Sequence, residues 1–295
     1  MSFARDLREG LLVGGASDAD LARRVLAGMP GAAMPPQHFA TAGDLPALLA
    51  YVRTLLPADA ATRGVTAATD LVATPVPALP DDPERLRAMI PITGPIWLAP
   101  VARRPGSVLE ASVGAARGAT RIAIRVRWHD ASADARALDA VAESDAVAVQ
   151  FVADPDDPAY GMGAPASVSE IWHWAAFRRE ELAGALDLLE ADHGLGPAFV
   201  RAEGLTRPLQ QASRVTAAGP DDRRVEPGAV AVSAVRDDEH WDVVFVAPRD
   251  APPFDAASAN AGGLVAFGVA VWNGSAGEKG AVKSFSGWIR LAPEP

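Results

Sequence analysis

The sequence predicts a mainly β protein, an antiparallel β-sandwich with a few helices, preceded by a small α-helical segment. Three observations support this fold class. Apolar residues alternate with a period of two in most segments after residue 96, whereas helical periodicity is concentrated in residues 1–57. The 295 residues include 26 glycines and 25 prolines, which favour many turns and short elements. Hydrophobic residues make up 49% and charged residues 22% of the chain, as in ordinary globular proteins.

The first segment, residues 1–57, is expected to form two short helices. Ser17 and Asp20 have the spacing of a capping box in front of one apolar helical face, and Asp44 begins a second such pattern. Two short helices bury little core, so this segment either needs a partner or is a remnant of a larger domain. Prolines then recur up to Pro95, and we interpret residues 58–95 as a Pro-rich linker.

The second domain is expected to occupy residues 96–295 and to consist mostly of strands. The segments with period-two alternation are 121–128, 145–151, 229–235, 241–247, 264–272 and 287–291. In the first of them, apolar side chains share one face and three arginines the other, which is typical of a half-buried antiparallel strand. Residues 178–194 are predicted to form a helix that ends near Gly194.

Composition excludes several classes of function. There are 27 basic and 37 acidic residues, and the net charge of −10 argues against a nucleic-acid-binding surface. The chain has no cysteine, which excludes disulfides, thiolate metal sites, cysteine nucleophiles and covalent attachment of haem c. No apolar run reaches the roughly 18 residues of a membrane span. The first residues lack the apolar run of a signal peptide, so the chain as it stands would be cytoplasmic.

The two lysines, Lys279 and Lys283, stand out among the 27 basic residues. Arginine replaces lysine at little cost on a solvated surface, but only lysine can release its proton to leave a neutral amine. The segment 271–291 therefore has two interpretations. It is a charged hairpin loop that protects a sheet edge, or it turns Lys283 inward, where desolvation lowers the pKa of the amine.

A second unusual segment precedes an aromatic strand. Met162 lies between two glycines, which would let the backbone approach a bulky, flat group. Trp172 and Trp174 alternate with His173, so both indoles are expected to share one face. A thioether and a neutral amine suit haem iron as axial ligands, which makes Met162 and Lys283 a candidate pair.

These segments resemble the haem-b-binding γ subunits of the ethylbenzene dehydrogenase and dimethylsulfide dehydrogenase group, which belong to molybdenum enzyme complexes of the DMSO reductase family. The segments that match, in the order of the family, are 121–132, 144–151, 160–176, 240–250 and 265–291. The resemblance implies a β-sandwich that holds one non-covalent haem b between a methionine and a lysine. It implies a subunit that relays electrons between the iron–sulfur and molybdopterin subunits of a complex and a soluble cytochrome or similar carrier.

Carried onto this chain, the resemblance places the iron ligands at Met162 and Lys283. Lys283 is preferred over Lys279 because the lysine of the family comes just before a segment with serine and tryptophan, here 284–288. Trp172, His173 and Trp174 would line or neighbour the haem pocket.

The N-terminal segment resembles the C-terminal half of a class I cytochrome c domain, with Met34 at the position of the distal iron ligand. The half that carries C-x-x-C-H is missing, so Met34 would be a vestigial ligand. The segment is then either a degenerate remnant, or the true start lies upstream, where a signal peptide and the haem c motif would be found. The family resemblance implies the periplasm.

Two other functions are open at this stage. One is a haem-free carbohydrate- or ligand-binding β-sandwich, in which exposed tryptophans stack on sugars. The other is a metal-dependent enzyme that uses His129, Asp130 and His173, although these residues have no recognisable ligand spacing. The sequence has no G-x-S-x-G, H-E-x-x-H or P-loop motif, and the resemblance implies an electron-transfer subunit and not a catalytic one.

Overall fold

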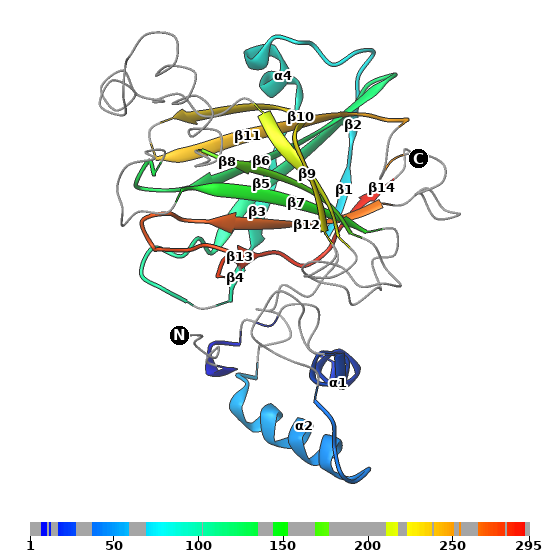
Figure 1. Ribbon diagram of the computed structural model, residues 1–295, viewed down its shortest axis with the longest axis vertical. Coiled ribbons are helices and arrows are strands. Elements are labelled where there is room, and N and C mark those ends of the chain that lie inside the picture. Colours follow the sequence, from blue (N-terminus) through cyan, green and yellow to red (C-terminus); the bar gives the residue numbers. More distant parts are fainter. Residues whose placement is uncertain are drawn as a thin grey trace.

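The computed structural model describes the following residues: 7–10, 12, 17–27, 37–58, 69–101, 103–134, 144–152, 169–176, 211–217, 223–237, 239–250, 254, 265–280 and 282–292. Most of the described elements are strands, and the predicted mainly β fold is confirmed (Figure 1). The expected helix over 178–194 lies outside the described residues.

Two α-helices form at the N-terminus, as the helical periodicity predicts. They are α1 (Asp18–Ala27) and α2 (Asp44–Leu55), preceded by a short 3-10 helix, η1 (Leu7–Glu9). Leu12, Leu21 and Leu49 form a small core between them. Figure 1 shows these helices below the strands, as a unit apart from the sheet. Within the described residues, no helix combines the length and the apolar character needed to cross a bilayer.

The strands form one sheet. They are β1 (Thr69–Val72), β2 (Thr74–Pro75), β3 (Thr93–Trp97), β4 (Ala99–Pro100), β5 (Glu110–Arg117), β6 (Arg121–His129), β7 (Ala146–Val152), β8 (Ser169–Ala175), β9 (Gln211–Ala217), β10 (Arg223–Asp237), β11 (His240–Pro248), β12 (Val265–Trp272), β13 (Ser284–Phe285) and β14 (Ile289–Ala292). All six predicted strands are present, and β5 and β9, which are poor in large apolar residues, were not predicted.

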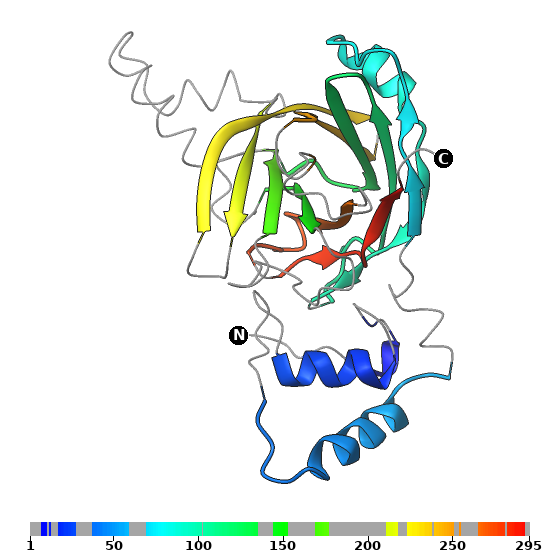
Figure 2. The same ribbon diagram turned by 90° about the vertical axis from the view of Figure 1, so that its right-hand side faces the viewer.

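The sheet curls until its two ends nearly meet. Its strand order is β1-β14-β12-β7-β8-β9-β10-β11-β6-β5-β2. Pairing is antiparallel along this path except at the two ends, where β1 pairs in parallel with β14 and β2 in parallel with β5. Because Ala73 alone separates β1 from β2, one short stretch of chain joins both ends of the sheet. Figure 2 shows the strands arranged around a common interior.

The interior is filled by the faces that the period-two alternation predicts to be apolar. Ile122, Ile124, Val126 and Trp128 of β6 are all in the main hydrophobic core. Indoles dominate the centre, where the ring centroids of Trp174 and Trp241 are 5.2 Å apart and those of Trp128 and Trp241 are 6.4 Å apart. Side chains of the alternate positions point to the outer face.

Part of the range 58–95 differs from the expected linker, because residues 69–95 fold onto the sheet. The prolines occupy positions where a missing N–H is tolerated. Pro75 lies in the end strand β2, and Pro95 lies at an irregularity of the β3–β5 pairing. Pro83 is at the start of α4 (Pro83–Met89), whose first turn is capped by the carboxylate of Asp82.

Candidate functional site

Lys283 lies at the end of the connection from β12 to β13. β13 returns antiparallel to β12, with Val271 opposite Ser284, and this register places Lys283 beside Trp272. The main-chain carbonyl of Lys283 accepts a hydrogen bond from Val101 N at 2.7 Å. Its backbone is therefore fixed on both sides, by β12 and by the segment next to β4.

The connection itself, residues 273–283, is called the lysine loop below, and it is held by several hydrogen bonds. The buried carboxylate of Glu278 accepts from Ser107 Oγ at 2.6 Å and from Asn273 N at 3.0 Å. Arg104 Nη1 donates to the main-chain carbonyls of Ala276 and Gly277. Positive φ values at Gly277 (65°) and Gly280 (56°) allow the turns that these bonds close. The loop thus presents Lys283 in a defined position.

The amine of Lys283 lies over an aromatic ring. Its Nζ is 5.1 Å from the centroid of the Trp272 ring. Within the described part of the chain, no salt bridge or hydrogen bond to this amine is present. Burial lowers the pKa of the amine from 10.5 to about 8. Lys279, by contrast, is exposed.

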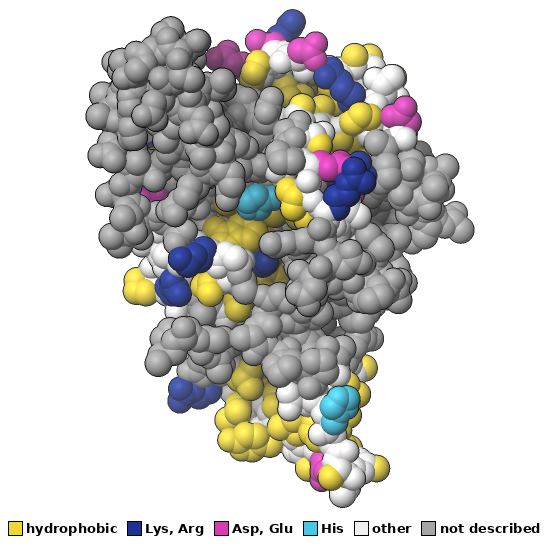
Figure 3. Space-filling view, in the orientation of Figure 1, with side chains coloured by type: hydrophobic (Ala, Val, Ile, Leu, Met, Phe, Trp, Pro, Cys, Tyr) yellow, Lys and Arg dark blue, Asp and Glu magenta, His cyan; other side chains and the backbone are white. Residues whose placement is uncertain are grey.

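The outer face of the sheet next to Lys283 is made of small residues. Ala146, Ala148, Ala175 and Ala270 lie together on β7, β8 and β12, and we call them the alanine face. Trp272 is cross-strand from Ala146, and His173 is cross-strand from Ala148. The rings of His173 and Trp272 meet edge to face at 5.4 Å. Figure 3 shows a histidine, hydrophobic side chains and basic side chains gathered over the middle of the sheet domain.

The structure separates the three residues of the aromatic strand that were expected around the site. His173 lies on the outer face with Trp272. Trp172 and Trp174 point into the core, as their shared face predicts, and are almost fully buried. Trp172 packs against Phe151 with a centroid distance of 4.5 Å. Met162, the other expected iron ligand, and Met34 lie outside the described residues.

The histidine-containing metal site considered from the sequence does not assemble. His129 is exposed, with its Nε2 3.0 Å from Glu239 and its ring against that of His240. Asp130 is buried and joins a different group, with Asp134 and Asp145. Among the described residues, neither His129 nor His173 belongs to a cluster of possible metal ligands. Asp134 and Asp145 were not singled out from the sequence, because nothing in their spacing indicates that they meet.

The fold and this site define a class of protein: a mainly antiparallel β domain that presents a lysine amine, with no ion-pair partner among the described residues, beside an apolar face of small residues. A comparison with protein families then identifies the family. The family model described as ethylbenzene dehydrogenase matches residues 98–284, more than half of the chain. The protein belongs to the ethylbenzene dehydrogenase family, as the five sequence segments indicate. This match does not include the N-terminal helices.

Two solved structures are similar to this chain at a low level. A putative carbohydrate-binding protein from Bacteroides uniformis ATCC 8492 has a TM-score of 0.41 and 13% identity, over 78% of this chain and 94% of that chain. A family 9 carbohydrate-binding module from Caldicellulosiruptor kristjanssonii, in complex with cellotriose, has a TM-score of 0.36 and 7% identity, over 77% and 94%. Likeness at this level carries no argument about function. A search of the curated proteins finds no match to the sequence.

Proposed function

We propose that this chain is the haem b electron-transfer subunit of a multi-subunit molybdenum oxidoreductase, with Lys283 and Met162 as axial ligands of the iron. The observation that carries the proposal is the Lys283 amine, which lies over Trp272 with its pKa lowered by burial and forms no ion pair with the residues that the structure describes. Membership of the ethylbenzene dehydrogenase family supports it. When bound, the haem would supply reversible one-electron exchange, and the chain itself would carry no substrate chemistry.

The donor chemistry of Lys283 fits an iron ligand. An amine binds a metal through its lone pair, so it must first lose its proton. With a pKa of about 8, about one amine in ten is neutral at pH 7, against about one in 3,000 at the ordinary 10.5. Burial therefore removes most of the proton competition that a surface lysine would face.

The neighbouring residues fit a flat, apolar group. The alanine face is bordered by the rings of Trp272 and His173 and by the side chain of Ile171. An apolar surrounding of this kind tunes the potential of a bound redox centre. The lysine loop supplies rigidity, since its hydrogen bonds fix the backbone on which Lys283 stands.

The expected partners are iron–sulfur and molybdopterin subunits on one side and a soluble carrier on the other. The net charge of −10 suits a basic carrier, because opposite charges steer the encounter. The N-terminal helices remain assigned to a partial cytochrome c segment, and the periplasm remains the proposed location. Both assignments rest on the family resemblance.

The positions of the tryptophans do not support the alternative function, a haem-free carbohydrate-binding module. Sugar-stacking platforms need exposed indoles, yet six of the seven tryptophans are buried. Only Trp97 is exposed, at 52%.

The two lysines provide the experiment. The full chain is produced with haem supplied, and its absorption spectrum is recorded in oxidised and dithionite-reduced forms, with a pyridine haemochrome assay. We expect about one non-covalent haem b per chain and a low-spin spectrum.

Lys283→Ala should abolish or shift that spectrum, whereas Lys279→Ala should leave it unchanged. Met162→Ala tests the second ligand, with Met89→Ala as its control.

Two results would overturn the proposal. A colourless protein that does not take up added haem removes the electron-transfer function altogether. A spectrum unchanged in Lys283→Ala eliminates Lys283 as the ligand even if haem binds.

A further inference from the structure

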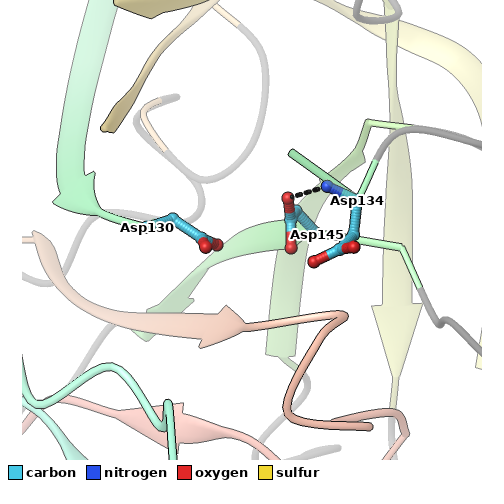
Figure 4. Close-up of side chains that lie close together, drawn as sticks. All are labelled: Asp130, Asp134 and Asp145. Carbon is cyan, nitrogen blue, oxygen red and sulfur yellow. Dashed lines mark hydrogen bonds between the residues drawn. The ribbon is translucent and has the colours of Figure 1, made fainter. Parts of the chain in front are cut away.

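Three aspartates lie close together at the end of the sheet where β6 ends and β7 begins. Asp130 follows β6 directly, Asp134 is in the loop after it, and Asp145 comes just before β7. One carboxylate oxygen of each lies within 4.8 Å of the other two (Figure 4). Asp130 and Asp145 are exposed by only 1% and 0%. Three carboxylates are thus brought out of water into a small volume.

The hydrogen bonds to these carboxylates leave one oxygen unsatisfied. Asp145 Oδ2 accepts from Asp134 N at 2.7 Å and from Trp241 Nε1 at 2.9 Å, and its Oδ1 accepts from Gly274 N at 2.9 Å. Asp130 Oδ1 accepts from Ser132 N at 3.1 Å. Asp130 Oδ2 is buried and has no hydrogen-bond partner. In Figure 4 the carboxylate of Asp130 points towards the other two, so this bare oxygen belongs to the cluster.

The hydroxyl of Ser132 cannot satisfy both of the carboxylates that it lies near. Its Oγ is 2.7 Å from Asp134 Oδ2 and 3.1 Å from Asp130 Oδ1. A hydroxyl has one hydrogen, so it can donate to only one of the two carboxylates at a time. The hydroxyl oxygen and the bare carboxylate oxygen both remain available to a cation.

The cluster also has no cationic partner among the described side chains. Within the described part of the chain, no salt bridge reaches any of the three carboxylates. Arg236 Nη2 donates at 2.7 Å to the main-chain carbonyl of Asp130, not to its carboxylate. A buried negative charge without a partner is costly, and an unsatisfied oxygen adds to that cost. A bound cation would offset both.

We propose that Asp130, Asp134 and Asp145 form a binding site for a hard divalent cation of the calcium type. The ligand set consists of oxygen atoms alone, whereas zinc and copper prefer nitrogen and sulfur ligands. Calcium accepts several protein oxygens in an irregular arrangement, whereas magnesium keeps most of its own waters. A buried group of three carboxylates and a hydroxyl matches calcium better.

The site connects directly to the lysine loop. Asp145 Oδ1 accepts from Gly274 N, in the first turn of that loop, and its Oδ2 accepts from the indole of Trp241 in the core. An ion held by Asp145 would therefore stiffen the end of the sheet from which the lysine loop departs. The cation site does not depend on haem binding.

The test uses terbium as a luminescent calcium substitute on the full chain. Trp241 touches Asp145, so excitation of tryptophan should sensitise terbium bound at the cluster, and added calcium should displace it. Calcium should also raise the unfolding temperature, by about 5–10 °C when its free concentration is about a hundred times the dissociation constant.

Asp130→Asn and Asp134→Asn should each weaken calcium binding at least tenfold. Asp237→Asn is the matched control, because Asp237 is an exposed aspartate paired with Arg127 at 3.1 Å, and this variant should bind calcium normally. Asp134 is less buried than Asp130, so its variant tests the site even if Asp130→Asn does not fold.

Three results would overturn the proposal. In the first, wild-type protein shows no terbium luminescence and no calcium-dependent shift, and the buried carboxylates then share a proton instead. In the second, magnesium binds more tightly than calcium. In the third, Asp130→Asn and Asp134→Asn bind calcium as well as the Asp237→Asn control does. None of these results changes the haem spectrum expected for Lys283, so the two proposals fail separately.

Discussion

In the haem-free protein, the protonated amine of Lys283 lowers the stability of the folded chain. The amine lies over the Trp272 ring, which does not replace the water that an ammonium group loses on burial. A cation–π contact recovers only part of that loss.

The pH dependence of stability follows from the lowered pKa of Lys283. Below pH 8 the amine is protonated in both the folded and the unfolded chain, and the full cost of burying the charge is present. Between pH 8 and 10.5 the folded chain has released the proton while the unfolded chain still holds it, so stability rises with pH. We expect the haem-free protein to gain at most about 3 kcal/mol over this range.

Denaturant unfolding of the haem-free protein across this pH range measures the effect. Lys283→Met keeps the length of the side chain and removes the charge, so its stability should exceed that of the wild type at pH 7 and the difference should shrink above pH 8. A constant difference between the two proteins would show that the amine does not titrate as described.

Sequence reasoning identified Lys283 but not Asp145, for a physical reason. A lysine among arginines is conspicuous by its chemistry, and the residues around it form a recognisable pattern. Asp130, Asp134 and Asp145 are ordinary aspartates in and near a loop. They meet because two strands end at the same edge, and no local spacing encodes that meeting.

At the scale of the elements, β6 shows what alternation does and does not predict. Its apolar face is in the core as expected. Its three arginines, equivalent in the pattern, differ in the fold. Arg125 lies under α4 with 16% exposure of its side chain, while Arg121 and Arg127 retain 37% and 31%. The difference arises from α4, which covers only the middle of the strand.

Arg125 ties three elements together. Its guanidinium makes a two-pronged ion pair with Asp242 of β11, with distances of 2.9 and 2.6 Å. Its Nη1 donates to the carbonyls of Arg87 and Ile90, at 2.9 and 2.8 Å, at the end of α4. The Arg87 carbonyl also accepts from Ile90 N at 3.2 Å, and Arg125 thus adds a donor where the last carbonyls of a helix lack intrahelical partners.

We expect Arg125→Ala to lower the free energy of unfolding by about 3 kcal/mol, because it removes the two-pronged pair and leaves the buried Asp242 carboxylate with only the longer contact to Arg87, at 4.0 Å. Arg127→Ala is the control on the same strand face. It removes an exposed pair with Asp237 and should cost less than about 1 kcal/mol. Urea unfolding of both variants measures the contrast, and equal losses would contradict the role assigned to α4.

At the scale of the whole molecule, closure of the sheet depends on residues 69–75. β1 covers the free edge of β14, and β2 covers the end of β5 that follows its pairing with β3. Without them, the edge of β14 and the last residues of β5 would be open to other chains. The sequence could not predict this arrangement, because periodicity identifies strands but not their order, and the prolines near β1 and β2 favoured a linker.

Two N-terminal truncations test the closure. Removal of residues 1–58 leaves β1 and β2 in place, so the unfolding temperature of the sheet domain should change little. Removal of residues 1–76 opens the edge of β14 and the end of β5, and it should lower the unfolding temperature and promote association. Thermal unfolding and size-exclusion chromatography distinguish the two truncated proteins. If both behave alike, β1 and β2 do not close the sheet in solution.

The pairing of β1 with β14 also sets the order of events during synthesis. Thr69 lies opposite Ile289, about 220 residues further along the chain. At ribosomal rates of about 5–20 residues per second, the first strand waits of the order of 10–40 s for its partner to be made. The nascent chain therefore cannot complete its sheet until translation is almost finished, and its newly made strands depend on chaperones or on one another during that interval.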